Sequence, residues 1–152
     1  YCRMLTFDAK QTIQEIYADQ IRWVFLDYPL EQVHPLARGI HEAAYCAGEQ
    51  GSHFEFIQTA FAEAPAESPD DVFRYAEALA LGLDAFTECV NEGRYSGQID
   101  ASIALVEQMG FGATPAVIFA RYDAGEYGER LTVLGAQPAE AFTQIIDQLL
   151  GD

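Results

Sequence analysis

Two short runs of strand-forming residues stand far apart in the chain, and their separation limits the fold more than any other feature. The first, Ile21–Leu30 (IRWVFLDYPL), is β-branched and aromatic and ends at Pro29, which predicts a buried strand. The second begins at Thr114 (TPAVIFARY), and a turn-rich stretch (DAGEYGE) separates it from a third run, RLTVLGAQ. Between the first two runs the patterns are helical. Strands split around a helical block predict an α/β domain with an all-helical insertion.

Helix signals fill the rest of the chain. From Cys2 onward, apolar residues recur at helical spacing, at Leu5, Ala9, Ile13, Ile16 and Tyr17. Inside the insertion, Ser68 as an N-cap with Pro69 at the first helical position predicts the start of a helix. We predict helices over residues 2–17, 34–51, 52–64, 68–81, 83–93, 96–110 and 138–150.

The first of these helices raises a problem of strand count. A helix that precedes a parallel strand is normally the crossover of a βαβ unit, yet no strand stands before residues 2–17. We therefore expect the first strand of the unit to lie outside this sequence. Its neighbours would then keep unpaired backbone groups, so we expect residues 1–152 alone to have a gapped, unstable sheet while the helical insertion persists.

Composition disfavours several classes of partner. The 152 residues carry a formal net charge of -16, and Lys10 is the only lysine. Phosphate binding needs clustered Lys and Arg, so nucleic acid is disfavoured, and the same charge disfavours adhesion to an anionic membrane surface. No apolar run approaches the ~20 residues that span a bilayer, and no signal-peptide pattern is visible.

Several short motifs, in order and at consistent distances, resemble the DsbA-like branch of the thioredoxin superfamily. YCR at the start matches the end of that family's Cys-x-x-Cys motif and the arginine after it, and Val24–Leu30 matches a strand of the VFRDYPL type. His34–Gly51 matches its HP-A…AA-CAGEQG helix, and Phe86–Tyr95 matches the end of the helical insertion. Gly110–Phe119 (GFGATPAVIF) matches the Gly-x-x-x-Thr-Pro signature, and LGAQP precedes the last helix as in the family.

The resemblance implies a thioredoxin-like α/β fold with an all-helical insertion and with its first central strand outside this chain. Residues 1–34 would form the first part of the thioredoxin-like domain, residues 35–110 the insertion, and residues 111–152 the second part, made of two strands and a helix. It also implies an extracytoplasmic protein, in the periplasm or at the cell surface, because disulfides persist there. It implies no cofactor and no metal.

By the same resemblance, Cys2 is the second cysteine of the Cys-x-x-Cys pair, and the first would lie upstream of Tyr1. In such enzymes the first cysteine sits at a helix N-terminus, where the dipole stabilises a thiolate that attacks a substrate sulfur. Cys2 would resolve the mixed disulfide, and Tyr1 would be among the substrate-binding residues. These residues alone could not complete a dithiol cycle. The alternative is a lone, partly buried cysteine. Cys2 cannot be the first cysteine of the motif, because Leu5 occupies the position where its partner would stand.

Thr114 and Pro115 form the second candidate site. A proline that opens a strand is common and can be purely structural. The resemblance instead implies the family's cis-proline, next to the cysteine pair, where the backbone of Thr114 is open to pairing with an extended substrate segment. Thr114 and Pro115 are therefore assigned to substrate binding.

Two further cysteines, Cys46 and Cys89, stand in the predicted insertion. Relatives often carry cysteine at both positions, so the resemblance favours a structural disulfide, and two unpaired buried cysteines are the alternative. A zinc site is disfavoured because its candidate ligands fit no usual spacing, and the histidines are interpreted as capping or surface residues. These candidate ligands are His34, His41, Cys46 and His53.

The favoured function is a thiol-disulfide oxidoreductase that acts on unfolded or thiol-containing proteins. A membrane protein is an optional redox partner, and no nucleic-acid partner is expected. The complete protein is expected to be a monomer. One alternative is a redox-inactive thioredoxin-like module that binds peptides or partners through the Thr114–Pro115 surface, and another is a glutathione-binding isomerase of the same fold. The residue three positions before Cys2 discriminates the oxidoreductase from the binding module: cysteine there supports the enzyme, and serine or alanine supports the binding module.

Overall fold

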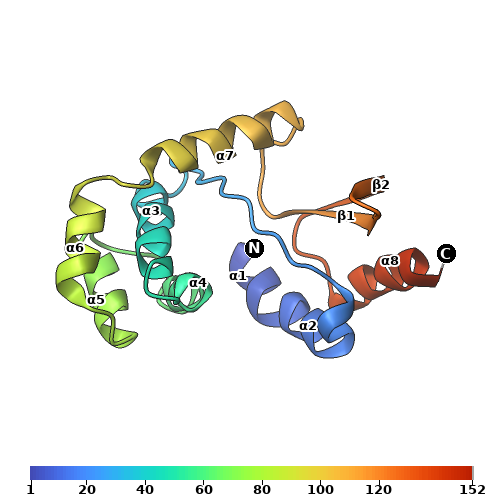
Figure 1. The fold of residues 1–152 in the computed structure, drawn as a ribbon, viewed down its shortest axis with the longest axis horizontal. Coiled ribbons are helices and arrows are strands. Elements are labelled where there is room, and N and C mark those ends of the chain that lie inside the picture. The colour runs from blue at the N-terminus through green and yellow to red at the C-terminus, as the bar shows by residue number, and fades with distance from the viewer. Residues whose placement is uncertain (152) are drawn as a thin grey trace. The chain divides into compact units, whose positions relative to one another are not determined.

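Residues 1–151, which a computed structural model describes, are divided between two units. The sheet unit consists of residues 1–24 together with residues 113–151, and the helical unit consists of residues 25–112. Figure 1 shows the elements of both units. Each unit has its own cluster of buried side chains. The predicted α/β fold with a helical insertion is confirmed.

A continuous helical stretch opens the sheet unit, as predicted for residues 2–17. Its parts are α1 (Cys2–Met4), the π-helical turn η1 (Leu5–Ala9), α2 (Lys10–Tyr17) and the 3-10 turn η2 (Ala18–Gln20). The buried side chains recur at every fourth residue, at Ala9, Ile13 and Tyr17. Ile16, which was predicted on the same face, is 53% exposed. Residues four apart lie on one face of a helix, and the face that carries Ala9, Ile13 and Tyr17 is the one turned to the core.

The two strands of the sheet unit form an antiparallel hairpin. β1 (Ala116–Asp123) pairs with β2 (Glu126–Leu134), with Phe119 opposite Leu131. Only Ala124 and Gly125 make the turn, and both have positive φ (50° and 92°), as the tightest hairpin turns require. The second strand therefore begins at Glu126, earlier than the predicted start at Arg130, because most of the turn-rich stretch belongs to the strands.

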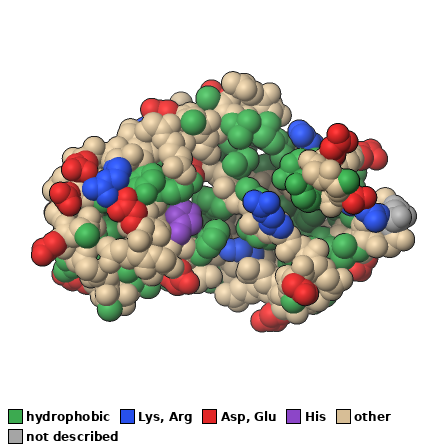
Figure 2. Space-filling view, viewed as in Figure 1, with side chains coloured by type: hydrophobic (Ala, Val, Ile, Leu, Met, Phe, Trp, Pro, Cys, Tyr) green, Lys and Arg blue, Asp and Glu red, His purple; other side chains and the backbone are tan. Residues whose placement is uncertain are grey.

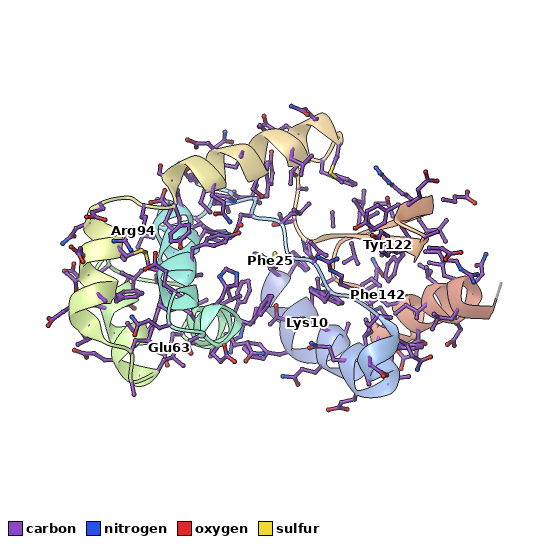
Figure 3. All side chains as sticks on the ribbon, in the orientation of Figure 1. Lys10, Phe25, Glu63, Arg94, Tyr122 and Phe142 are labelled. Carbon is purple, nitrogen blue, oxygen red and sulfur yellow. A yellow bond between two sulfur atoms is a disulfide. The ribbon has the colours of Figure 1, made fainter. Side chains whose placement is uncertain are left out.

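The C-terminal helix α8 (Ala139–Gly151) packs against β1 and α2. Its Phe142, labelled in Figure 3, is fully buried and lies 5.7 Å from Phe119 between ring centroids. The Tyr17 hydroxyl donates a hydrogen bond of 2.7 Å to Asp147 Oδ1. Burial raises the pKa of Tyr17, and the Asp147 carboxylate raises it further. The core of the sheet unit thus joins residues from both ends of the chain.

Trp23, the only tryptophan in the sequence, packs against this core. The Lys10 ammonium lies 5.6 Å from the centre of the Trp23 ring, a cation–π distance. Burial lowers the pKa of Lys10. Trp23 fluorescence is therefore a probe that reports on the sheet unit.

The predicted strand at Ile21–Leu30 is wrong. This segment is extended at Ile21 (φ -123°, ψ 151°), but no strand is formed between residues 21 and 30. Alternate residues remain more covered than their neighbours, so the period-two pattern was detected correctly. A strand also needs a hydrogen-bonded neighbour, and the Asp27 backbone instead bonds the Ser102 side chain. Within residues 1–151, the only sheet has the order β1-β2.

The helical unit is built around one central helix, as Figure 1 shows. That helix, α3, is in contact with all four of the others, and α4, α5 and α6 each bury an aromatic residue beside it. Phe56, Tyr75 and Phe86 are fully buried in this core. The bounds are α3 (Ala37–Gly48), α4 (His53–Ala62), α5 (Asp71–Ala78), α6 (Leu83–Asn91) and α7 (Ser96–Gln108). The predicted helices of the insertion are confirmed.

The start of α5 differs from its predicted position at Ser68. The helix begins at Asp71, and Ser68 stands in a turn before it. The Asp71 carboxylate accepts hydrogen bonds from the N–H groups of Glu67 (2.8 Å) and Ser68 (3.2 Å). Ser68 Oγ accepts one from the Asp70 N–H. Local side-chain bonds of this kind favour a turn over the first turn of a helix.

Acidic side chains are spread over the visible face of the protein in Figure 2, in keeping with the net charge of -16. Across residues 1–151, every helix is too short or too polar to span a bilayer.

Candidate functional site

Cys2 is a free, partly buried cysteine at the first residue of α1 in the sheet unit. The Thr6 hydroxyl donates a hydrogen bond of 2.9 Å to the Cys2 carbonyl, which holds the turn that carries the thiol. Tyr1 precedes it and is 83% exposed, so its ring is open to a partner molecule.

Thr114 and Pro115 lie directly before β1, in the same unit as Cys2. The peptide bond between them is cis. Pro115 is buried, and its carbonyl accepts a 2.8 Å hydrogen bond from the Gly135 N–H, which fixes the start of β1 against the end of β2. Thr114 is half-buried. The sheet unit therefore contains all of the predicted catalytic and substrate-binding residues.

The helical unit contains a disulfide between Cys46 of α3 and Cys89 of α6, with an S–S distance of 2.04 Å. Both cysteines are buried in the aromatic core. The bond leaves Cys2 as the only free thiol in the part of the chain that the structure describes.

The residues weighed as zinc ligands have other roles. In residues 1–151, no group of three or more His, Cys, Asp or Glu side chains is arranged to hold a metal ion. His53 Nδ1 lies 3.0 Å from the Ala44 carbonyl, and His34 is exposed. His41 was interpreted as a capping or surface residue, which is wrong, because it faces a buried carboxylate.

That carboxylate belongs to Asp27, a residue that the sequence reasoning did not single out. Asp27 is 1% exposed, and no other charged side chain among residues 1–151 is buried. The Tyr45 hydroxyl donates a hydrogen bond of 2.6 Å to Asp27 Oδ2, and His41 Nδ1 lies 2.6 Å from Oδ1. On the backbone, the Asp27 N–H donates to Ser102 Oγ (2.8 Å), whose hydroxyl donates to the Asp27 carbonyl (2.9 Å). Side chains of α3 and α7 thus satisfy Asp27 completely.

Burial and the Asp27 carboxylate together raise the pKa of Tyr45 to about 12. An ionised carboxylate can only accept hydrogen bonds, so the neutral hydroxyl is the form that this site stabilises. His41 also stacks on Phe25, with 6.2 Å between ring centroids. The sequence did hold a signal for the cluster: the period-two pattern of Ile21–Leu30 places Asp27 on its covered side, where a charged group needs partners.

Comparisons with known proteins agree with this fold. A family model described as thioredoxin matches residues 1–148. The crystal structure of a Wolbachia pipientis alpha-DsbA1 variant, in which two cysteines are replaced by alanine, matches with a TM-score of 0.75. The identity is 22%, and the match covers 99% of this chain and 79% of that one. At this identity the likeness shows the fold.

The relatives found among curated proteins are much longer than the chain. The Na(+)/H(+) antiporter NhaA 3 of Salinispora tropica is 34% identical over 109 residues, which cover 70% of this chain and 17% of that protein. The Na(+)/H(+) antiporter NhaA 1 of Salinispora arenicola is 31% identical over 137 residues, or 88% of this chain and 21% of that protein. The chain thus spans about a fifth of the length of these relatives.

The family model extends over nearly the whole chain, and the solved structure shares both the sheet unit and the helical unit. The chain therefore belongs to the thioredoxin family and has the DsbA-like form of its fold.

Proposed function

We propose that the chain is the thioredoxin-like part of a thiol-disulfide oxidoreductase that forms or exchanges disulfides in thiol-containing proteins. The observation that carries the proposal is the free Cys2 on the first turn of α1 in a thioredoxin-family fold. In such folds the nucleophilic cysteine sits at the helix N-terminus, where unpaired amides favour a thiolate, and the resolving cysteine follows three residues later on the same helix, which is the place we assign to Cys2.

Cys2 acts in this proposal as the resolving cysteine, and its partner is a nucleophilic cysteine from outside residues 1–152. The partner thiolate attacks a substrate disulfide and forms a mixed disulfide, releasing one substrate sulfur as a thiolate. The Cys2 thiolate then attacks the partner's sulfur, the mixed disulfide breaks, and the second substrate sulfur leaves as a thiolate. The enzyme pair ends as a disulfide, and the substrate has gained two electrons. Run in reverse, the same steps oxidise a substrate.

Thr114, Pro115 and Tyr1 bind the substrate in this proposal. Thr114 lies directly before β1 and outside the β1–β2 ladder, which begins at Ala116, so its backbone can pair with an extended peptide, as in other strand-addition complexes. The exposed Tyr1 ring stands next to the thiol in sequence and supplies apolar contact to the same peptide.

We propose that the protein works outside the cytoplasm. The Cys46–Cys89 disulfide supports this, because buried structural disulfides form and persist in oxidising compartments. The antiporter names belong to whole proteins about five times as long as the matched region, and ion exchange is not part of the proposal.

Replacing Cys2 by serine in the full-length natural protein tests the assignment. We expect disulfide exchange with a reduced or scrambled protein substrate to fall at least about a hundredfold, with mixed disulfides accumulating because the resolving thiolate is absent. A Thr6→Ser variant is the matched control, since it keeps the hydroxyl that bonds the Cys2 carbonyl. Unchanged turnover in Cys2→Ser would contradict the role of Cys2.

A redox-inactive binding module is the second candidate, because peptide binding at Thr114, directly before β1, does not require a cysteine. This candidate predicts that the natural full-length protein binds extended peptides, that Cys2→Ser leaves this binding unchanged, and that neither form exchanges disulfides. Saturable competition of that binding by glutathione would instead favour the isomerase.

A further inference from the structure

Each cysteine of the disulfide is followed three residues later by a glutamate: Cys46 by Glu49, and Cys89 by Glu92. Residues three apart lie on the same side of a helix, so both carboxylates extend from the helix faces that carry the sulfurs. Only one of them reaches a sulfur. Glu49 Oε1 lies 3.8 Å from Cys89 Sγ. A disulfide sulfur has no proton to donate, so this contact places a carboxylate directly against the sulfur.

Both glutamates share one guanidinium. Arg94 Nη1 lies 2.9 and 2.7 Å from the two Glu49 oxygens, and Arg94 Nη2 lies 2.7 Å from Glu92 Oε2. The Tyr95 hydroxyl donates a further bond of 3.0 Å to Glu49 Oε1. Figure 3 shows Arg94 beside the disulfide. Two carboxylates on one cation leave an excess of one negative charge, and the carboxylate nearer the sulfur belongs to Glu49.

This carboxylate is ionised under ordinary conditions. The Arg94 guanidinium, and after it the Tyr95 hydroxyl, hold the pKa of Glu49 below its usual value. The side chains of Glu49 and Arg94 keep 31% and 37% of their surface exposed, so a reagent can approach them from solvent. The sulfurs beneath are buried.

We propose that Glu49 is an electrostatic guard of the Cys46–Cys89 disulfide, which slows attack by thiolates and so keeps the bond oxidised in the presence of low-molecular-weight thiols. All of the residues involved lie in the helical unit, so this role of Glu49 is independent of the role proposed for Cys2.

The guard acts on the charges that reduction creates. A thiolate of a dithiol reductant attacks the Cys46 sulfur, the S–S bond breaks, and its electron pair leaves on Cys89 Sγ. That sulfur becomes a thiolate beside the Glu49 carboxylate, which repels it. The second thiolate of the reductant then attacks the mixed disulfide and releases Cys46. The reductant is oxidised by two electrons to a cyclic disulfide, and the two protein thiolates take up protons from solvent.

The size of the effect follows from distance and screening. Two like charges about 4 Å apart repel strongly at protein dielectric, but Arg94 and solvent offset most of that repulsion, so we expect roughly a threefold to tenfold effect on rate. Glu92 carries the same charge and binds the same arginine without contacting a sulfur, so it provides a matched control.

Charge must be separated from simple cover, because the Glu49–Arg94 pair could also protect the disulfide by blocking access. Replacing Arg94 distinguishes repulsion by charge from blocked access. An Arg94→Gln variant leaves the Glu49 charge unscreened, so the guard predicts slower reduction. Loss of cover predicts faster reduction of the same variant.

The experiment measures reduction of the native disulfide by dithiothreitol, with acid quenching, alkylation and mass spectrometry of the Cys46 and Cys89 peptides. Rates are taken in the range of low urea where they do not change with denaturant, so that they report on the folded protein.

We expect Glu49→Gln to be reduced about threefold to tenfold faster than the parent, Glu92→Gln to stay within about twofold, and Arg94→Gln to be slower. All forms should react equally in denaturing guanidinium chloride. Equal native rates for Glu49→Gln and Glu92→Gln, or faster reduction of Arg94→Gln, would overturn the proposal. If Glu49→Gln does not fold, the direction of the Arg94→Gln change decides alone.

Discussion

In the helical unit a disulfide joins α3 to α6 inside an aromatic core, whereas the sheet unit has a single pair of strands and, within residues 1–151, no covalent cross-link. The helical unit is also continuous in sequence, from residue 25 to residue 112. The sheet unit is assembled from two separate stretches of chain. One polypeptide thus has its cross-linked core in a continuous insertion, whereas its thiol-bearing part depends on contacts between two distant stretches of chain.

Removing the Phe142 side chain should have the largest effect, and it should fall on the sheet unit. Phe142 is fully buried against Phe119, and truncating a buried Phe to Ala typically costs about 3–5 kcal/mol. We expect Phe142→Ala to shift the urea transition reported by Trp23 fluorescence strongly. Leu150→Ala, on the exposed side of the same helix, should cost less than about 1 kcal/mol. Equal shifts of the Trp23 and circular-dichroism transitions would show that the two units unfold as one.

Removing the disulfide should have the next largest effect, and it should fall on the helical unit. Cys46 and Cys89 are 43 residues apart in sequence, and closing a loop of that size contributes roughly 4 kcal/mol in the chain-entropy account. The Cys46→Ala, Cys89→Ala double variant should therefore lose stability by circular dichroism more than by Trp23 fluorescence. Non-reducing peptide mapping of the parent should recover the linked pair, and quantitative alkylation of both thiols without a reductant would contradict the bond.

The smallest effect is a pH dependence, and each unit supplies one tyrosine–aspartate pair for it. Tyr45 donates to Asp27 in the helical unit, and Tyr17 donates to Asp147 in the sheet unit. A tyrosine whose pKa is raised by folding contributes stability that is fully present below its unfolded pKa, near 10, and is lost as pH rises through the folded value, about 12 for Tyr45.

We therefore expect Tyr45→Phe to weaken the alkaline loss of stability in the helical unit over that range, as followed by circular dichroism. Tyr17→Phe should do the same for the sheet unit, as followed by Trp23. An identical alkaline midpoint in the parent and in Tyr45→Phe would show that the Asp27 pair does not contribute.

The sequence predicted the helices well because their signals are local. Caps, glycines and apolar spacing all act within one or two turns. Even the shifted start of α5 results from hydrogen bonds between a side chain and backbone groups only three or four residues away in sequence. The strand at Ile21–Leu30 failed for the opposite reason. Its residue types suit a strand, but a strand exists only with a paired neighbour, which local composition does not specify.

The candidate site divides in the same way. Cys2, Thr114 and Pro115 were found through their resemblance to a family, in which the spacing of motifs carries the information. The Asp27 cluster has no such motif. Its members come from an extended segment, α3 and α7, and Ser102 lies 75 residues from Asp27. Predicting it requires knowing which helix faces meet, and that depends on tertiary packing.

The split sheet unit also sets an order of events during synthesis. All of the helical unit leaves the ribosome before β1 and α8 have been made, so it can fold first. Tyr17 and its partner Asp147 are 130 residues apart. At elongation rates of about 5–20 residues per second, roughly 6–26 s pass between the synthesis of Tyr17 and that of Asp147. During this interval the apolar face of α2, with Ile13 at its centre, lacks the α8 side chains that later cover it. The helix that carries Cys2 therefore exposes an apolar face during this interval, and a chaperone that binds it would have to stay bound until α8 has been made.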